Sequence, residues 1–387
     1  MQIGFIDFSR EERNKVLATL RMLGTQTALD ELGIGVIRDA YADIMFPGIS
    51  TIQTRAKYFV LIPYLFSKAA NQNFSSGNEL YRWLIANEDG LVEILVRNSG
   101  AEATGIIGKN ALKQKRVVKM KPSSIYWNGL RTFEIVRNPG LSLKSACDIT
   151  WRSAQNKKVL QPKVDGETFD DRSAGSGHAV LFSPIQPDYD FMKESAMSLT
   201  LKEAEYLEGR ILKSSATQNT LMAFLIKNRI NCDQFEDIPS AILPPEIKSD
   251  FLLARDFSQF IVGAHIRYNV IFSNGNDKKM NESFEKWLLE IRQNPIDLSR
   301  VLGRIKSNNH TSKFCKDFFE SAISNDLKRM DELIIAREKA VKSDRSKLCK
   351  PSEYQYDHNR PIHFYKLDYR FGTAKNIIED IIAGLEK

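Results

Sequence analysis

Two aspartates near the start of the sequence have the spacing of a small acidic site. Asp39 and Asp43 are four residues apart in the stretch RDAYADIMFPG, so both lie on one face of the helix that this stretch predicts. Two such carboxylates can bind a divalent cation, and a metal-dependent nuclease would add a further acid, for example Asp368. The alternative, which we favour, is that both acids form ion pairs with Arg38 or Arg55 across a helical hairpin.

The stretch STIQTRAKYF, which follows the PG turn, has side chains of the types that contact phosphates and base edges. It is therefore a candidate reading helix of a helix-turn-helix motif. However, Ile52 comes too early after Gly48 for that motif, and the following KYFVLIPYLF is too apolar to lie exposed. We expect a structural ion-pair cluster in this stretch, and the alternative is an acidic site made by the same residues. These residues are Arg38, Asp39, Asp43, Gln53 and Arg55.

Positive charge is concentrated between residues 97 and 163. This segment has fourteen Lys or Arg and three acidic residues, a balance of +11, whereas the whole chain carries +7, so the rest carries about −4. Basic side chains hold phosphates and an exposed aromatic ring can stack on a base, so the pattern predicts binding to DNA or RNA. The residues expected to bind nucleic acid are Lys109, Lys113, Lys115, Arg116, Lys119, Lys121, Trp127 and Arg131. The alternative is a solvated basic face with Trp127 buried, as tryptophan usually is.

Histidine and cysteine give no signal for a metal or redox centre. The four cysteines and five histidines are dispersed, without the spacing of zinc ligands or of a disulfide framework. We therefore predict no metal and no cofactor.

The elements that carry these residues are mainly helices, so the predicted fold class is mainly α with minor β. Ser9 and Glu12 form a capping box ahead of a helix that should end at Gly24. A second helix is expected at 36–46, and a third begins at a capping box of Ser50 and Gln53 and runs toward Pro63. The predicted helix that follows Ser9 has one apolar face, made by Val16, Leu17, Leu20 and Leu23.

Four consecutive segments follow from these patterns. Residues 1–97 form a helical N-terminal domain, and 98–163 a small basic module, winged-helix-like or purely helical. Residues 164–190 are rich in Gly, Pro, Ser and Asp, which indicates a linker, and 191–387 form a helical C-terminal domain.

We expect a cytoplasmic protein without a membrane anchor. The N-terminus lacks the basic start and apolar core of a secretory signal. The most apolar stretch, YFVLIPYLF, has nine residues, whereas a helix that crosses a bilayer needs roughly 20.

Three stretches resemble an uncharacterised bacterial family of roughly this length: DELGIGVIRDAYADIMFPGISTIQTRAKYFVLIPYLF, KPSSIYWNGLR and RPIHFYKLDYRFGTAK. Members of that family are associated with phage-defence gene neighbourhoods, beside helicases and phospholipase-D-like proteins, and have no assigned catalytic residues. The resemblance implies a non-enzymatic, nucleic-acid-binding subunit of a defence complex. The alternatives are a metal-dependent nuclease and a scaffold that docks an acidic partner protein.

Overall fold

The computed structural model describes residues 30–100, 102–114, 116, 118–159, 181–183 and 185–387. The fold is mainly α, as predicted. Within these ranges, β pairing is confined to one isolated antiparallel bridge between Val136 and Phe182. The same ranges contain no helix that is both long enough and apolar enough to cross a membrane.

The chain divides into two compact units, each made of segments that are distant in sequence. Of the described residues, those up to 41 and 252–367 belong to the first unit, and those in 42–251 and 368–387 belong to the second. The division into four consecutive segments, which we expect from the sequence, remains a prediction.

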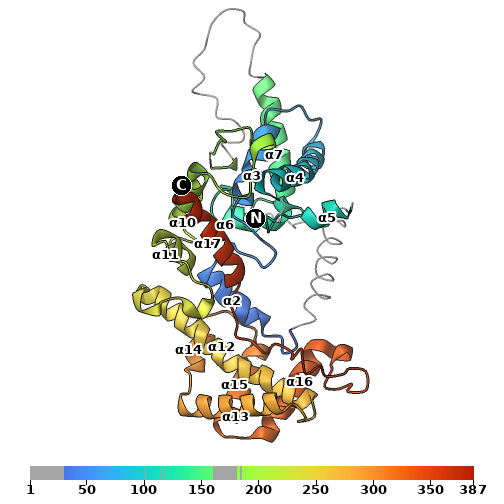
Figure 1. The fold of residues 1–387 in the computed structure, drawn as a ribbon, viewed down its shortest axis with the longest axis vertical. Coiled ribbons are helices and arrows are strands. Elements are labelled where there is room, and N and C mark those ends of the chain that lie inside the picture. Colours follow the sequence, from blue (N-terminus) through green and yellow to red (C-terminus); the bar gives the residue numbers. More distant parts are fainter. Residues whose placement is uncertain (1–29, 101, 115, 117, 160–180, 184) are drawn as a thin grey trace, which may run out of the picture. The chain divides into compact units, whose positions relative to one another are not determined.

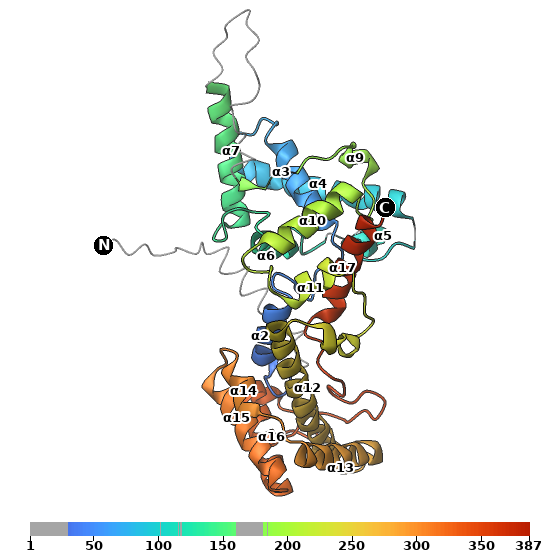
Figure 2. The same ribbon diagram turned by 90° about the vertical axis from the view of Figure 1, so that its left-hand side faces the viewer.

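The first unit is built on the C-terminal part of the long helix α12, around which α13, α15 and α16 gather (Figure 2). Gly263 of α12 lies so close to the indole ring of Trp287 that a Cβ atom at residue 263 would overlap the ring. Phe260 packs edge-on against Phe318. The helices in this part of the chain are α2 (Gly35–Met45), α12 (Pro245–Phe272), α13 (Lys278–Gln293), α14 (Leu298–Gly303), α15 (Asn309–Ile323), α16 (Leu327–Lys342) and the 3-10 turn η4 (Ser343–Arg345).

The second unit packs α4 against α7 and α10 against α17, and both pairs can be followed in Figure 1. Helix α3 lies in the core, since ten of its twelve residues are buried. The helices are α3 (Tyr58–Ala69), α4 (Gly77–Ser99), α5 (Lys109–Lys113), α6 (Pro122–Thr132), α7 (Leu143–Val159), α9 (Phe191–Glu194), α10 (Leu201–Lys213), α11 (Leu221–Lys227), η2 (Phe235–Asp237), η3 (Ser240–Ile242) and α17 (Phe371–Leu385).

Several sequence signals of helix position are confirmed. The helix expected at 36–46 is α2, observed at Gly35–Met45. Thr200 and Glu203, in the stretch TLKE, also have the spacing of a capping box, and they form both of its hydrogen bonds at the start of α10. The helix expected after Ser9 lies outside the described residues.

The predicted helix that starts at Ser50 is wrong. Gln53 Oε1 does accept the N–H of Ser50, at 3.2 Å, but residues 51–57 form two turns joined by irregular backbone, and the helix begins only at Tyr58. The helix-turn-helix interpretation therefore fails, because STIQTRAKYF does not form a reading helix and α3 is buried. A winged-helix hairpin is also not formed by the described part of 98–163, where the Val136 bridge is the one β contact.

Candidate nucleic-acid interface

Residues 104–107 lead into the basic stretch, which we define as residues 109–121. They are held by residues 54–58, which precede and begin helix α3. Thr54 Oγ1 donates to the carbonyl of Gly105 at 2.7 Å, and Arg55 Nη1 donates to that of Thr104 at 3.2 Å. The hydroxyl of Tyr58 accepts the N–H of Ile107 at 2.8 Å. The beginning of the basic stretch is therefore fixed by hydrogen bonds to its backbone.

Two glycines let this loop lie close to its neighbours. Gly105 and Gly108 have φ values of +76° and +95°, which side chains with a Cβ rarely adopt. A Cβ on Gly105 would also lie 2.6 Å from Cγ of Arg55, and one on Gly108 would lie 2.9 Å from Cγ2 of Val118. The sequence GIIG thus allows a close approach of this loop to Arg55 and Val118.

The hydroxyl of Tyr126, on α6, ties the same turn to the helix that follows the basic stretch. It accepts the N–H groups of Thr54 at 2.7 Å and Arg55 at 3.0 Å, and it donates to the carbonyl of Arg55 at 2.9 Å. Tyr126 is fully buried, so these bonds replace water for three backbone groups.

The end of the basic stretch is held by Glu88 of α4. Its carboxyl group accepts the backbone N–H of Ser123 at 2.6 Å and the Ser123 hydroxyl at 3.1 Å, in the first turn of α6. Burial raises the pKa of Glu88 to about 7, against the opposing effect of the hydrogen bonds from Ser123. Residues 109–121 are therefore anchored on both sides.

Replacing Glu88 by glutamine should make the second unit less sensitive to pH between about 5 and 7. The pKa of Glu88 is about 7 in the folded protein against 4.5 ordinarily. In this range the carboxyl group ionises in the unfolded chain and stays largely protonated in the folded chain, so rising pH favours unfolding. The native protein should lose about 3 kcal/mol in this way, because a pKa that differs by one pH unit between the folded and unfolded chain corresponds to about 1.4 kcal/mol. Glutamine keeps both contacts with Ser123 and does not ionise. Urea unfolding of both proteins across the pH range measures the difference, and parallel stability curves would refute the assignment.

The cationic side chains on this anchored stretch fall into two groups. Lys113, Arg116 and Lys119 are exposed and have no acidic partner among the described residues. In contrast, Lys109 Nζ donates to the carbonyl of Ala103 and Lys121 Nζ pairs with Asp89. Lys115 lies outside the described residues.

Trp127 does not contribute an exposed ring. Its side chain is only 7% exposed, and Nε1 donates to the carbonyl of Leu141 at 2.7 Å. Base stacking by Trp127 is therefore not possible in this structure. Arg131 donates from Nη2 to Asn128 and, with Arg137, lines a separate cavity of about 330 Å³.

The acidic and basic side chains of residues 38–55 are paired. Arg38 Nε lies 3.2 Å from Asp39, and Asp43 pairs with Arg370 at 2.6 Å. Gln53 is buried and its amide group bonds to backbone groups of the turn.

The partner of Arg55 is Asp380 of α17. Arg55 donates from Nε and Nη2 to both oxygens of the Asp380 carboxylate, at 2.6 to 3.0 Å. Asp380 also accepts the backbone N–H of Ala56 at 2.8 Å. Arg55 thus links residues 54–56 to helix α17 (Phe371–Leu385), in addition to its hydrogen bond to Thr104.

The three carboxylates of the nuclease alternative do not make one site in the described part of the chain. Asp43 is paired with Arg370, and Asp368 accepts the backbone N–H of Arg370. In these residues, no group of three or more His, Cys, Asp or Glu side chains has a geometry that could hold a metal ion.

Several residues that position the basic stretch were not predicted from the sequence. Tyr58 and Tyr126 lie in apolar stretches that indicate only burial, so nothing in the sequence marks their hydroxyl groups as anchors. Glu88 could have been noticed, because it interrupts the apolar face of α4 formed by Leu84, Leu91 and Leu95. A carboxyl group on a buried face needs a donor, and Ser123 is that donor.

Residues 1–156 match DUF6361, a family of unknown function. No curated protein matches the chain. No solved structure matches it either.

Proposed function

We propose that this chain binds nucleic acid through the anchored basic face, defined as Lys113, Arg116 and Lys119, as a non-enzymatic subunit of a bacterial anti-phage defence complex. The observation that carries the proposal is that these three cations are exposed and lack acidic partners among the described residues, on a stretch held at both ends. Unpaired cations fixed to a folded surface attract phosphates and release their counterions.

The chemistry of this face favours contact with the backbone of DNA or RNA over reading of bases. With Trp127 buried and hydrogen-bonded, the face offers Lys and Arg but not that aromatic ring. Lysine and arginine contacts to phosphates set position and affinity without sequence information. We therefore expect binding that tolerates sequence and depends steeply on salt.

The defence context rests on the resemblance of the three stretches described above. A subunit that holds a strand beside a helicase or a phospholipase-D-like protein needs a basic, non-catalytic surface, and the basic face supplies one. The match of residues 1–156 to a family of unknown function is compatible with this role.

Changing Lys113, Arg116 and Lys119 together to alanine should weaken binding to labelled DNA or RNA about tenfold to a hundredfold at low salt. The slope of log affinity against log salt should fall by up to about 2.7 on duplex DNA, because each lost phosphate contact contributes about 0.9. Fluorescence anisotropy across a salt series, with single- and double-stranded DNA and RNA, measures both quantities.

The matched control removes the same charge from exposed lysines of the first unit, Lys286, Lys316 and Lys328. It should bind like the native protein. Equal binding by the two triple variants, or no binding by the native protein at low salt, would overturn the proposal. Cleavage of the nucleic acid in the presence of Mg²⁺ would favour the nuclease, and equal binding to a generic acidic protein would favour the scaffold.

A further inference from the structure

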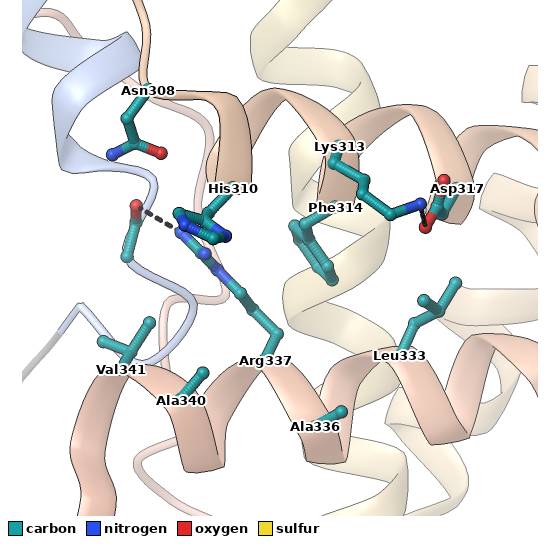
Figure 3. A pocket seen from close by; sticks show the side chains of 11 residues that line it. Asn308, His310, Lys313, Phe314, Asp317, Leu333, Ala336, Arg337, Ala340 and Val341 are labelled. Carbon is teal, nitrogen blue, oxygen red and sulfur yellow. Dashed lines mark hydrogen bonds and ion pairs between the residues drawn. The ribbon is translucent and has the colours of Figure 1, made fainter.

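The first unit contains an open groove between α15 and α16, with a cavity of about 640 Å³ (Figure 3). The side chains that form its floor are apolar, and they come from one position on α15 and four on α16: Phe314, Leu333, Ala336, Ala340 and Val341.

Apart from His310, the polar side chains that line this groove have partners among the described residues. Arg337 donates to the carbonyls of Leu32 and Gly33, at 2.8 and 3.1 Å, and to the hydroxyl of Thr311 at 2.7 Å. Lys313 pairs with Asp317 at 2.7 Å, as the dashed line in Figure 3 shows. The surface that remains for a ligand is therefore mainly apolar.

Helix α16 has two apolar faces, and only one of them is covered. Met330 and Ile334 are buried against the unit. Leu333 is half-buried, whereas Ala336 and Ala340 are exposed, and these three follow one another at intervals of three and four residues. This spacing is that of an amphipathic stripe, and the small alanines allow another helix to approach closely.

The described part of the chain starts at the edge of this groove. Gly33 lines the cavity, and the Arg337 bonds to residues 32 and 33 fix its position. Asp30 accepts the N–H groups of Ile34 and Gly35, at 3.0 and 2.8 Å, and so fixes the start of α2. The point to which residues 1–29 are joined therefore lies close to the uncovered face of α16.

We propose that this groove binds the amphipathic helix that the sequence predicts for residues 9–23 of the same chain. The predicted apolar face of that segment contains Val16, Leu17, Leu20 and Leu23, and it needs a covering surface of this kind. The connector of six residues, 24–29, can span roughly 20 Å, and the predicted helix is roughly 22 Å long. Both lengths suit docking on a groove that Gly33 borders.

Hydrogen exchange of the full chain, followed by mass spectrometry, tests the contact. In the native protein, the amides of residues 13–23 should exchange at least tenfold more slowly than in the free peptide. Leu20→Asp on the segment and Ala340→Glu in the groove should each abolish that protection. Lys328→Glu, on α16 but outside the groove, should leave it unchanged. Exchange at the free-peptide rate in the native protein, or protection that survives Ala340→Glu, would overturn the proposal.

A disulfide test does not depend on the folding of charged variants. The substitutions Leu20→Cys and Ala336→Cys, in a chain that also carries Cys232→Ser and Cys349→Ser, should give a disulfide within one molecule under mild oxidation. A disulfide that joins two molecules would show that the groove receives the segment of a second copy, and no disulfide in a folded protein would show that it receives neither. Both results contradict the proposal.

Discussion

Replacing Lys57 by methionine is expected to lower the free energy of unfolding of the second unit by about 3 to 5 kcal/mol. Lys57 and Glu203 form an ion pair at 2.6 Å, and each side chain is only 1% exposed. Burial lowers the pKa of Lys57, and the adjacent carboxylate opposes that shift. Methionine has a similar length but no charge, so it would leave the Glu203 carboxylate buried without a cation.

The hydrogen bonds around this pair limit the expected loss in the free energy of unfolding. Glu203 still accepts the hydroxyl of Tyr189 at 2.7 Å, that of Tyr64 at 3.3 Å and the N–H of Thr200 at 2.9 Å. The double variant Lys57→Met with Glu203→Gln should recover part of the stability, because no charge stays buried.

Urea unfolding followed by tryptophan fluorescence is suited to this test, because Trp83, Trp127 and Trp151 belong to the second unit and report on it. A change below about 1 kcal/mol in the single variant would mean that the cation contributes no more than an exposed pair does.

The second large expected effect is a loss of stability of the first unit at low pH. The first unit should lose about 1.4 kcal/mol of stability for each pH unit below about 6.5 through His265 alone. His265 is buried, and neither of its ring nitrogens has a hydrogen-bond partner in the part of the chain that the structure describes. Burial lowers its pKa to about 3, with a further contribution from the charge of His363, whose ring lies 5.0 Å away. The unfolded chain binds this proton from about pH 6.5 downward and the folded chain does not, so falling pH favours unfolding.

His363 adds to the same dependence. Burial lowers its pKa, and the charges of Arg38 and Lys342 act in the same direction, while Asp30 and Glu31 oppose them. Protonation of one imidazole places a charge beside its stacked neighbour, so the two rings are coupled.

His265→Leu should remove about 3 kcal/mol of the acid-induced loss between pH 6 and 4. Unfolding monitored by Trp287, the tryptophan of the first unit, measures it. His310→Gln, at an exposed site on α15, is the matched control and should keep the native acid loss. Acid curves of equal slope for the native and His265→Leu proteins would show that His265 has a partner or water in solution.

A local sequence signal predicts a helix correctly where the contacts that form it are local. Thr200 and Glu203 are three residues apart, and the bonds they make are the ones their spacing predicts. The same type of signal failed at Ser50 and Gln53, where the polar bonds close a turn. The difference lies in tertiary contacts, since Tyr126 binds the N–H groups of Thr54 and Arg55.

The partners within the site could not be predicted because they are distant in sequence. Arg55 meets Asp380, and Asp43 meets Arg370, across more than three hundred residues. Composition located the basic segment, but it could not separate the exposed Lys113 from Lys121, which Asp89 neutralises. Burial of Trp127 likewise depends on Leu141 and on the rings of Phe66 and Phe182.

The ion pair between Arg55 and Asp380 also joins two residues that are synthesised far apart in time. They are 325 positions apart, so the turn that holds the basic face cannot meet this partner until the intervening chain has been made. Until then the guanidinium of Arg55 and the N–H of Ala56 must be satisfied by water. A nascent chain of this protein would therefore display its basic stretch before the frame that fixes it is complete.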